Sequence, residues 1–379
     1  MKKFILTAAL AMAILASCTK NEVKVTVPDQ AISFTTAVGA NSTKAMIDNA
    51  TYPSDETFGT FAFYLPTGQS WFTNNAAAEL YIPHSEVKYV DDVDNVHRWT
   101  TDTKYYWPTA GSLTFFSYSP YDINASVTCS TETNGIVISN YDVDKYQKHD
   151  VMVADVCADQ TTNGSNNGLT GVPTVFRHKL AQIVAFNFNT AEDYGAAKDP
   201  HVAGDKEIIV TGISINDLRT TGTYYSGRMV GAASLGNWQD WTGSKNYVWY
   251  AAESANLGEE IVYNGSGYTT SVKTDGTNAV ANDYLLVLPQ PFSDNDTQVI
   301  TLNYTIRTYT DSTTSTDDDV TVSIPLFDIH GEAGFQMNKK ITYNFTIGLD
   351  QIWWAPSVAD WENETHSITI NQGKVTVNS

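Results

Sequence analysis

The stretch Ile341-Thr342-Tyr343-Asn344-Phe345-Thr346-Ile347 decides the fold class, because apolar and polar side chains alternate at every one of its positions. Successive side chains of a β-strand point to opposite faces of a sheet, so this period of two predicts a strand with one buried face. The same alternation recurs at residues 23–27, 32–35, 61–64, 113–118, 136–138, 208–210, 213–215, 284–288, 299–304 and 320–324. Helical periodicity is nearly absent, and the sequence therefore predicts an all-β protein.

The turn residues and the chain length predict how these strands are organised. Clusters of Asn, Asp, Gly and Ser interrupt the strands about every eight to fifteen residues, which is typical of antiparallel β-sandwiches. A chain of 379 residues is long for one core, and a charged run at residues 191–200 separates two strand-rich halves. We therefore expect two β-sandwich domains in tandem, at residues 18–190 and 191–379. The polar tracts at residues 161–168 and 308–319 are expected to be solvated loops.

The first residues have the pattern of an export signal. Lys2 and Lys3 precede an apolar stretch, residues 4–15, that is too short to span a membrane. Leu15-Ala16-Ser17-Cys18 follows and resembles the bacterial lipobox, in which the cysteine is lipidated and the signal is cut before it. We expect residues 1–17 to be a lipoprotein signal peptide and Cys18 to carry the lipid. The alternative is an ordinary secretory signal with a chance cysteine.

Charge and cysteine content narrow the possible partners. The formal net charge of -20 repels phosphate backbones and anionic head groups, so it argues against nucleic-acid binding and against membrane contacts beyond the lipid. Cys129 and Cys157 could pair in an oxidising compartment or remain as small buried hydrophobic residues. The sequence leaves both states open.

Motifs for catalysis and metal binding are missing, so the sequence predicts a protein that is not an enzyme and has no metal or cofactor. Arg177-His178-Lys179 is interpreted as a structural cluster at a strand edge. The acidic runs at residues 91–94 and 317–319 could attract calcium, but a solvated loop is the favoured interpretation. A hydrolase with a carboxylate pair assembled from distant strands stays open as a third function.

Tryptophans suggest a different function. Trp353, Trp354 and Trp361, with Trp238 and Trp241, could form a platform for sugar rings, although core packing is the favoured interpretation. An exposed platform would indicate a surface glycan-binding lipoprotein of a polysaccharide uptake system.

The C-terminal tail contains two short alternating segments, residues 367–370 and 374–377, joined by a turn. Their apolar faces are Ile368 with Ile370 and Val375 with Val377. Such strands could extend the sheet of another subunit as a donor strand, or close as a hairpin on their own domain. Both alternatives stay open.

A series of individually weak segments recurs in a fixed order along nearly the whole chain. They are Cys18 and residues 31–34, 42–45, 58–61, 104–108, 113–120, 150–154, 176–180, 288–291 and 343–361. This series resembles the fimbrillin-like subunits of the type V pili of Bacteroidia. The resemblance implies two transthyretin-like domains in tandem, in a structural and adhesive pilus subunit exported as an outer-membrane lipoprotein. The implied partners are other pilin subunits, the lipid anchor, and ligands on host or bacterial surfaces.

The resemblance also implies how such subunits assemble. A protease removes the first strand, here within residues 23–36, and the C-terminal strands of a neighbour fill the groove. The cut would follow Lys44, and the donor would lie between Ile368 and Val377. The family usually has Arg at the cut, and this chain has no Arg before Arg98. Either a lysine-accepting protease acts, or the subunit stays uncut as a lipid-anchored base, while the tail argues for a stalk or anchor position over the tip.

Overall fold

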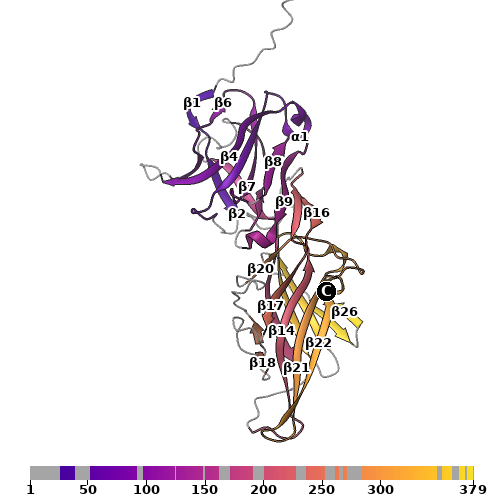
Figure 1. The fold of residues 1–379 in the computed structure, drawn as a ribbon. Helices are drawn as coiled ribbons and strands as arrows, with labels where there is room; N and C mark the ends of the chain where they lie inside the picture. Colours follow the sequence, from indigo (N-terminus) through magenta and orange to yellow (C-terminus); the bar gives the residue numbers. More distant parts are fainter. Residues whose placement is uncertain are drawn as a thin grey trace, which may run out of the picture.

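The computed structural model describes residues 26–38, 52–91, 97–123, 125–147, 150–161, 171–190, 200–227, 236–251, 261–263, 268–270, 284–347, 352–360, 367–371 and 374–378. Strands dominate these ranges, and the helices are short, such as α1 (Trp71–Asn74) and α3 (Leu326–His330). The prediction of an all-β protein is confirmed. No helix in the described part of the chain is long and apolar enough to cross a membrane. Figure 1 shows an elongated molecule with two strand-rich lobes arranged end to end.

The first lobe is built around an eight-stranded sheet. Its strands, in spatial order, are β10 (Met152–Ala154), β12 (Val172–His178), β2 (Phe34–Val38), β5 (His97–Thr101), β4 (Glu79–Asp91), β3 (Phe58–Leu65), β7 (Ser112–Ser119) and β11 (Cys157–Gln160). Because β10 also pairs with β7, every strand except β11 belongs to a closed ring. A closed ring gives each of its strands two neighbours and so removes exposed edges.

A second sheet packs against this ring through a shared hydrophobic core. Its strands, in order, are β16 (Asn237–Thr242), β15 (Thr221–Tyr225), β9 (Gly135–Asp142) and β8 (Ser126–Ser130). β15 and β16 come late in the sequence but pair with the early strand β9, so the chain returns to the first lobe after entering the second.

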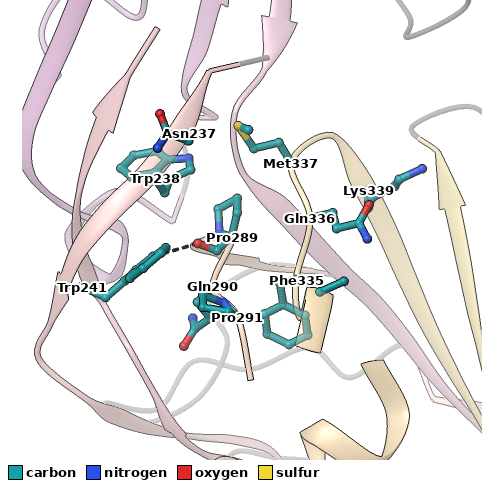
Figure 2. Close-up of a pocket in the computed structure, with 11 residues that line it drawn as sticks. Asn237, Trp238, Trp241, Pro289, Gln290, Pro291, Phe335, Gln336, Met337 and Lys339 are labelled. Carbon is teal, nitrogen blue, oxygen red and sulfur yellow. Dashed lines mark hydrogen bonds between the residues drawn. The ribbon is translucent and has the colours of Figure 1, made fainter. Parts of the chain in front are cut away.

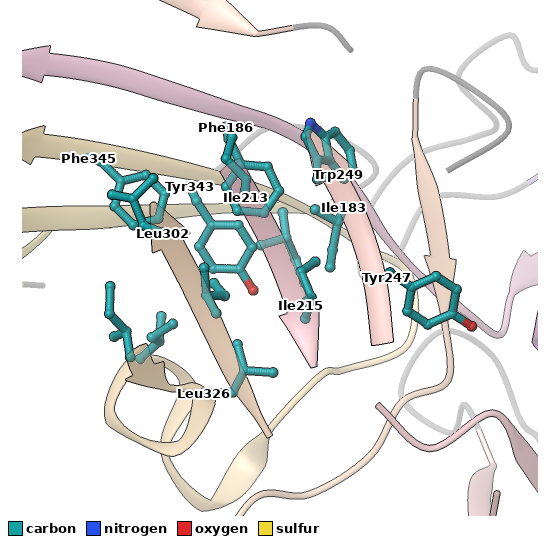
Figure 3. Packing of buried hydrophobic residues seen from close by; sticks show 14 of the residues in the cluster. Ile183, Phe186, Ile213, Ile215, Tyr247, Trp249, Leu302, Leu326, Tyr343 and Phe345 are labelled. Carbon is teal, nitrogen blue, oxygen red and sulfur yellow. The ribbon is translucent and has the colours of Figure 1, made fainter. Parts of the chain in front are cut away.

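The second lobe consists of two further sheets. One contains β19 (Tyr268–Thr270), β13 (Ala181–Thr190), β23 (Lys339–Ile347) and β24 (Ile352–Asp360), with β20 (Leu285–Val287) beside β13. The other contains β17 (Lys245–Ala251), β14 (Lys206–Leu218), β21 (Val299–Tyr309) and β22 (Ser315–Pro325), with β18 (Ile261–Tyr263) beside β14. Figure 3 shows aromatic and branched aliphatic side chains of both sheets meeting in one core.

The stretch that predicts the fold class folds as expected. Ile341, Tyr343, Phe345 and Ile347 of β23 are all buried, and the residues between them are partly exposed. The period of two therefore describes the packing of this strand directly.

The polar tract at residues 308–319 was expected to be a solvated loop, and this prediction is wrong. β21 extends to Tyr309 and β22 begins at Ser315, so only a short turn lies between them. Polar residues form a strand here because they bond across the pair: Arg307 donates two hydrogen bonds of 2.9 Å to the Asp317 carboxylate, and the Thr305 hydroxyl donates to Asp319. Of the other polar tract, residues 161–168, only Thr161 lies within the described residues.

Candidate functional site: the groove that holds strand β2

Strand β2 is attached to the ring very unequally on its two sides. It runs parallel to β12 over five residue pairs, from Phe34 opposite Val172 to Val38 opposite Phe176. On its other side it pairs with β5 only at Phe34 and Trp99. The segment just before β2 adds two hydrogen bonds of 2.7 Å, from the Val172 amide to the Ser33 carbonyl and from the Ile32 amide to the Tyr105 carbonyl. Withdrawal of β2 would open the ring and leave β12 and β5 as edges.

One side chain of β2, Phe34, and one of the segment just before it, Ile32, fill the core beneath the strand. Phe34 is 4% exposed and Ile32 is 3% exposed, and their spacing of two places both on the inner face. The Phe34 ring meets Phe58 at 5.7 Å and Phe115 at 5.8 Å between ring centroids, both edge to face. The groove beneath β2 is therefore apolar and aromatic, and exposing it would be unfavourable.

The wall of this cluster continues beyond the strands that flank β2. Tyr52 stacks on Phe176 with 4.8 Å between ring centroids, and its hydroxyl bonds to the Ser119 hydroxyl at 2.8 Å. Burial raises the pKa of Tyr52 above its usual range, as expected for a phenol inside an apolar core. Tyr52 is thus a fixed part of the groove.

Gly171 permits β12 to begin directly beside β2. Its φ of +90° lies in the region that favours glycine, and a β-carbon there would stand 2.8 Å from the carbonyl carbon of Phe34. No larger residue fits between the two backbones. This glycine is a site residue that the sequence analysis missed, because nothing local marks a glycine as a contact of a distant strand.

Of the predicted site residues, only those of the C-terminal tail lie within the described residues. Cys18 and Lys44 lie outside the described residues. The tail forms a hairpin of β25 (Ser367–Asn371) and β26 (Lys374–Asn378), in which Ile368 lies opposite Val377 and Ile370 opposite Val375. Among the described strands, β25 and β26 pair only with each other.

The tryptophans are divided between different parts of the molecule. Trp238 is buried in the core of the first lobe and donates a hydrogen bond of 2.7 Å to the Lys179 carbonyl. Trp241 lies on the same strand, β16, and packs at the edge of that core. Trp353 and Trp354 lie on β24, and Trp361 is outside the described residues.

In the Arg177-His178-Lys179 cluster, the first two side chains pair with aspartates elsewhere in the first lobe. Arg177 donates two hydrogen bonds of 2.7 Å to Asp155, and His178 pairs with Asp150. Lys179 is fully buried with its ammonium 5.7 Å from the centroid of the Tyr224 ring, and burial lowers its pKa to about 7. Inside the described ranges, no group of three His, Cys, Asp or Glu side chains could hold a metal ion.

The two described cysteines are free thiols. Both pack beside hydrophobic clusters, and burial raises the pKa of Cys157 to about 12. They therefore act as small hydrophobic residues, which was one of the two states left open by the sequence.

Comparison with known proteins identifies the relatives of the chain. The model of the fimbrillin-like family matches residues 43–361. No curated protein matches the chain. The fold is similar to the crystal structure of a fimbrial protein from Bacteroides vulgatus, with a TM-score of 0.60 and 18% identity, covering 87% of this chain and 99% of that one.

Two further solved structures are more distant. A proposed cell adhesion protein from Bacteroides uniformis has a TM-score of 0.45 and 16% identity, covering 88% of this chain and 99% of its own. Another from Parabacteroides distasonis has a TM-score of 0.48 and 13% identity, covering 88% of this chain and 98% of its own. The family match spans most of the chain and confirms the resemblance that was seen in the order of its sequence segments. The chain belongs to the fimbrillin-like family.

Proposed function

We propose that this chain is a structural and adhesive subunit of a cell-surface pilus, without catalytic residues. Membership of the fimbrillin-like family and the fold shared with a fimbrial protein support this role. The observation that carries the proposal is how β2 is held: it is a short strand near the start of the described residues, with five residue pairs on one side and one on the other, over an aromatic groove.

Assembly in this proposal is an exchange of strands. Cleavage after Lys44 releases β2, and the tail of a neighbouring subunit takes its place. Ile368 and Ile370, or Val375 and Val377, have the same spacing of two as Ile32 and Phe34, so either pair can present two apolar side chains to the groove.

The exchange is energetically feasible because the donor strand would replace the apolar side chains and main-chain hydrogen bonds of β2 with equivalent ones. Burying each large apolar side chain contributes roughly 1.5–3 kcal/mol, and the main-chain bonds to β12 are restored by any extended strand. The tail must first leave its own hairpin, so the donor gives up the pairing between β25 and β26.

Export and anchoring complete the proposal. The chain is exported as a lipoprotein, with Cys18 carrying an outer-membrane anchor, and each of its two lobes is a transthyretin-like domain, the chain passing between them more than once. A stalk subunit would lose the anchor together with β2, whereas a chain left uncut at Lys44 would remain as a base subunit.

The test compares three forms of the chain from Thr19 onward: the unaltered form, Lys44→Ala, and a form ending at Trp361. Each is examined by negative-stain electron microscopy before and after digestion with a lysine-specific protease, and mass spectrometry identifies the new N-terminus. We expect filaments only from the unaltered form after cleavage at Lys44.

Two outcomes would contradict the proposal. Filaments from the form ending at Trp361 would show that the tail is not the donor. Monomers from a correctly cut, full-tailed chain would rule out strand exchange as described. If such monomers bound a polysaccharide saturably, the alternative of a glycan-binding lipoprotein of an uptake system would be favoured.

A further inference from the structure

A pocket of about 510 Å³ lies where the two lobes meet, away from the β2 groove. Three segments line it: β16, residues 289–291, and residues 333–339 just before and at the start of β23. Figure 2 shows Trp238 and Trp241 on one side and Gln336 and Lys339 on the other. Its volume falls within the range of roughly 300–1,000 Å³ that is usual for small-molecule pockets.

The floor of the pocket is fixed by hydrogen bonds. Gln290 and Phe335 exchange main-chain bonds of 3.1 and 3.0 Å, which join the second and third segments. The buried Gln290 side chain bonds to the main chain of Arg219 and Leu288, and the Trp241 indole donates a bond of 2.8 Å to the Pro289 carbonyl. The three segments are therefore held together before any ligand arrives, and little ordering would accompany binding.

The close approach of the second and third segments requires Gly334. Its φ is +59°, and a β-carbon there would stand 1.9 Å from the Gln290 carbonyl oxygen. A side chain at this position would push the walls apart, so the glycine helps to keep the pocket in its present form.

Two polar side chains of the lining, Asn237 and Gln336, are open to solvent. No hydrogen bond joins either side chain to another residue in the described part of the chain. Each carboxamide offers two donors and one acceptor oxygen. The lining also includes the apolar side chains of Trp241, Phe335 and Met337. Lys339 is the only charged residue among those that line the pocket.

This chemistry selects a class of ligand. A pyranose ring has an apolar C–H face that packs on aromatic surfaces and neighbouring hydroxyl groups that match carboxamides. The two exposed side chains are uncharged carboxamides, which match hydroxyl groups and so favour an uncharged sugar. We infer that the pocket between Trp241, Asn237 and Gln336 binds a neutral pyranose of a surface glycan.

The test measures binding to the unassembled chain from Thr19 onward. The probes are the methyl glycosides of glucose, mannose and galactose, together with N-acetylglucosamine. Binding is detected by saturation-transfer NMR and quantified by calorimetry. We expect at least one probe to bind with a Kd in the millimolar range or tighter. Asn237→Ala and Gln336→Ala should each weaken that binding by about threefold to tenfold.

Gln239→Ala is the matched control, since this residue is an exposed glutamine on β16 that does not line the pocket. It should leave the affinity unchanged, and all three variants should keep the melting temperature of the parent because all three side chains are exposed. The inference is overturned if no probe binds at about 20 mM, or if loss of Asn237 and Gln336 has no more effect than loss of Gln239. The readout does not depend on filaments, so a failure of strand exchange would leave this result intact.

Discussion

Replacing Phe34 by alanine tests whether β2 is a seated part of the native fold. The ring is 4% exposed and packs edge to face on Phe58 and Phe115. Truncation of a buried phenylalanine typically costs about 3–5 kcal/mol, which combines lost transfer energy with the cavity left behind. This loss is a large part of the stability of about 5–15 kcal/mol that is usual for a domain.

The matched control is Thr35→Ala on the same strand, because Thr35 is exposed while its neighbour is buried. Urea unfolding followed by tryptophan fluorescence reports on this region, since Trp99 and Trp107 belong to the same cluster as Phe34. We expect Phe34→Ala to lower the free energy of unfolding by about 3–5 kcal/mol and Thr35→Ala by about 0.5 kcal/mol or less.

The same pair of variants addresses exchange. A weakened β2 should be displaced more readily, so Phe34→Ala should bind a synthetic peptide of residues 367–379 where the Thr35→Ala chain does not. The reasoning is refuted if both variants unfold at the same urea concentration, because β2 would then contribute no buried packing to the native state.

Three further predictions concern single residues. Lys179→Met should stabilise the protein by about 3–5 kcal/mol more at pH 6 than at pH 10. The reason is that burial lowers the pKa of Lys179 to about 7, so the unfolded chain binds the extra proton between that pH and about 10.5; a gain that is equal at both pH values in urea unfolding would contradict this. Gly171→Ala should lower the melting temperature more than Gly204→Ala, since both have positive φ but only the β-carbon at 171 would meet the backbone of β2; equal losses in calorimetry would show that the contact is unimportant. Ile370→Asp should abolish filaments after cleavage while Thr369→Asp retains them, as judged by electron microscopy; a loss in both variants would mean that charge, and not the apolar face, is what matters.

The local sequence was sufficient to predict a strand where alternation of apolar and polar residues marks it. β23 follows the predicted pattern because the side chains of Tyr343 and Phe345 are buried on one face of the strand, and this does not depend on which strands lie beside it. It was insufficient at residues 308–319, where polar composition predicted a loop. There the cross-strand bonds between Arg307 and Asp317 stabilise a strand, and such a bond is invisible until the register is known.

An all-β class, an acidic character and a fimbrillin-like order of segments follow from the sequence alone, because alternation, charge and motif order can be read along the chain without knowing which residues meet in space. The parallel pairing of β2 with β12, the closure of the ring by β10 against β7, and the shared pocket of Asn237 and Gln336 depend on the tertiary structure. Alternation states which face of a strand is buried but not which strand lies beside it. Main-chain hydrogen bonds are the same for every sequence, so the choice of neighbour depends on how the whole core packs.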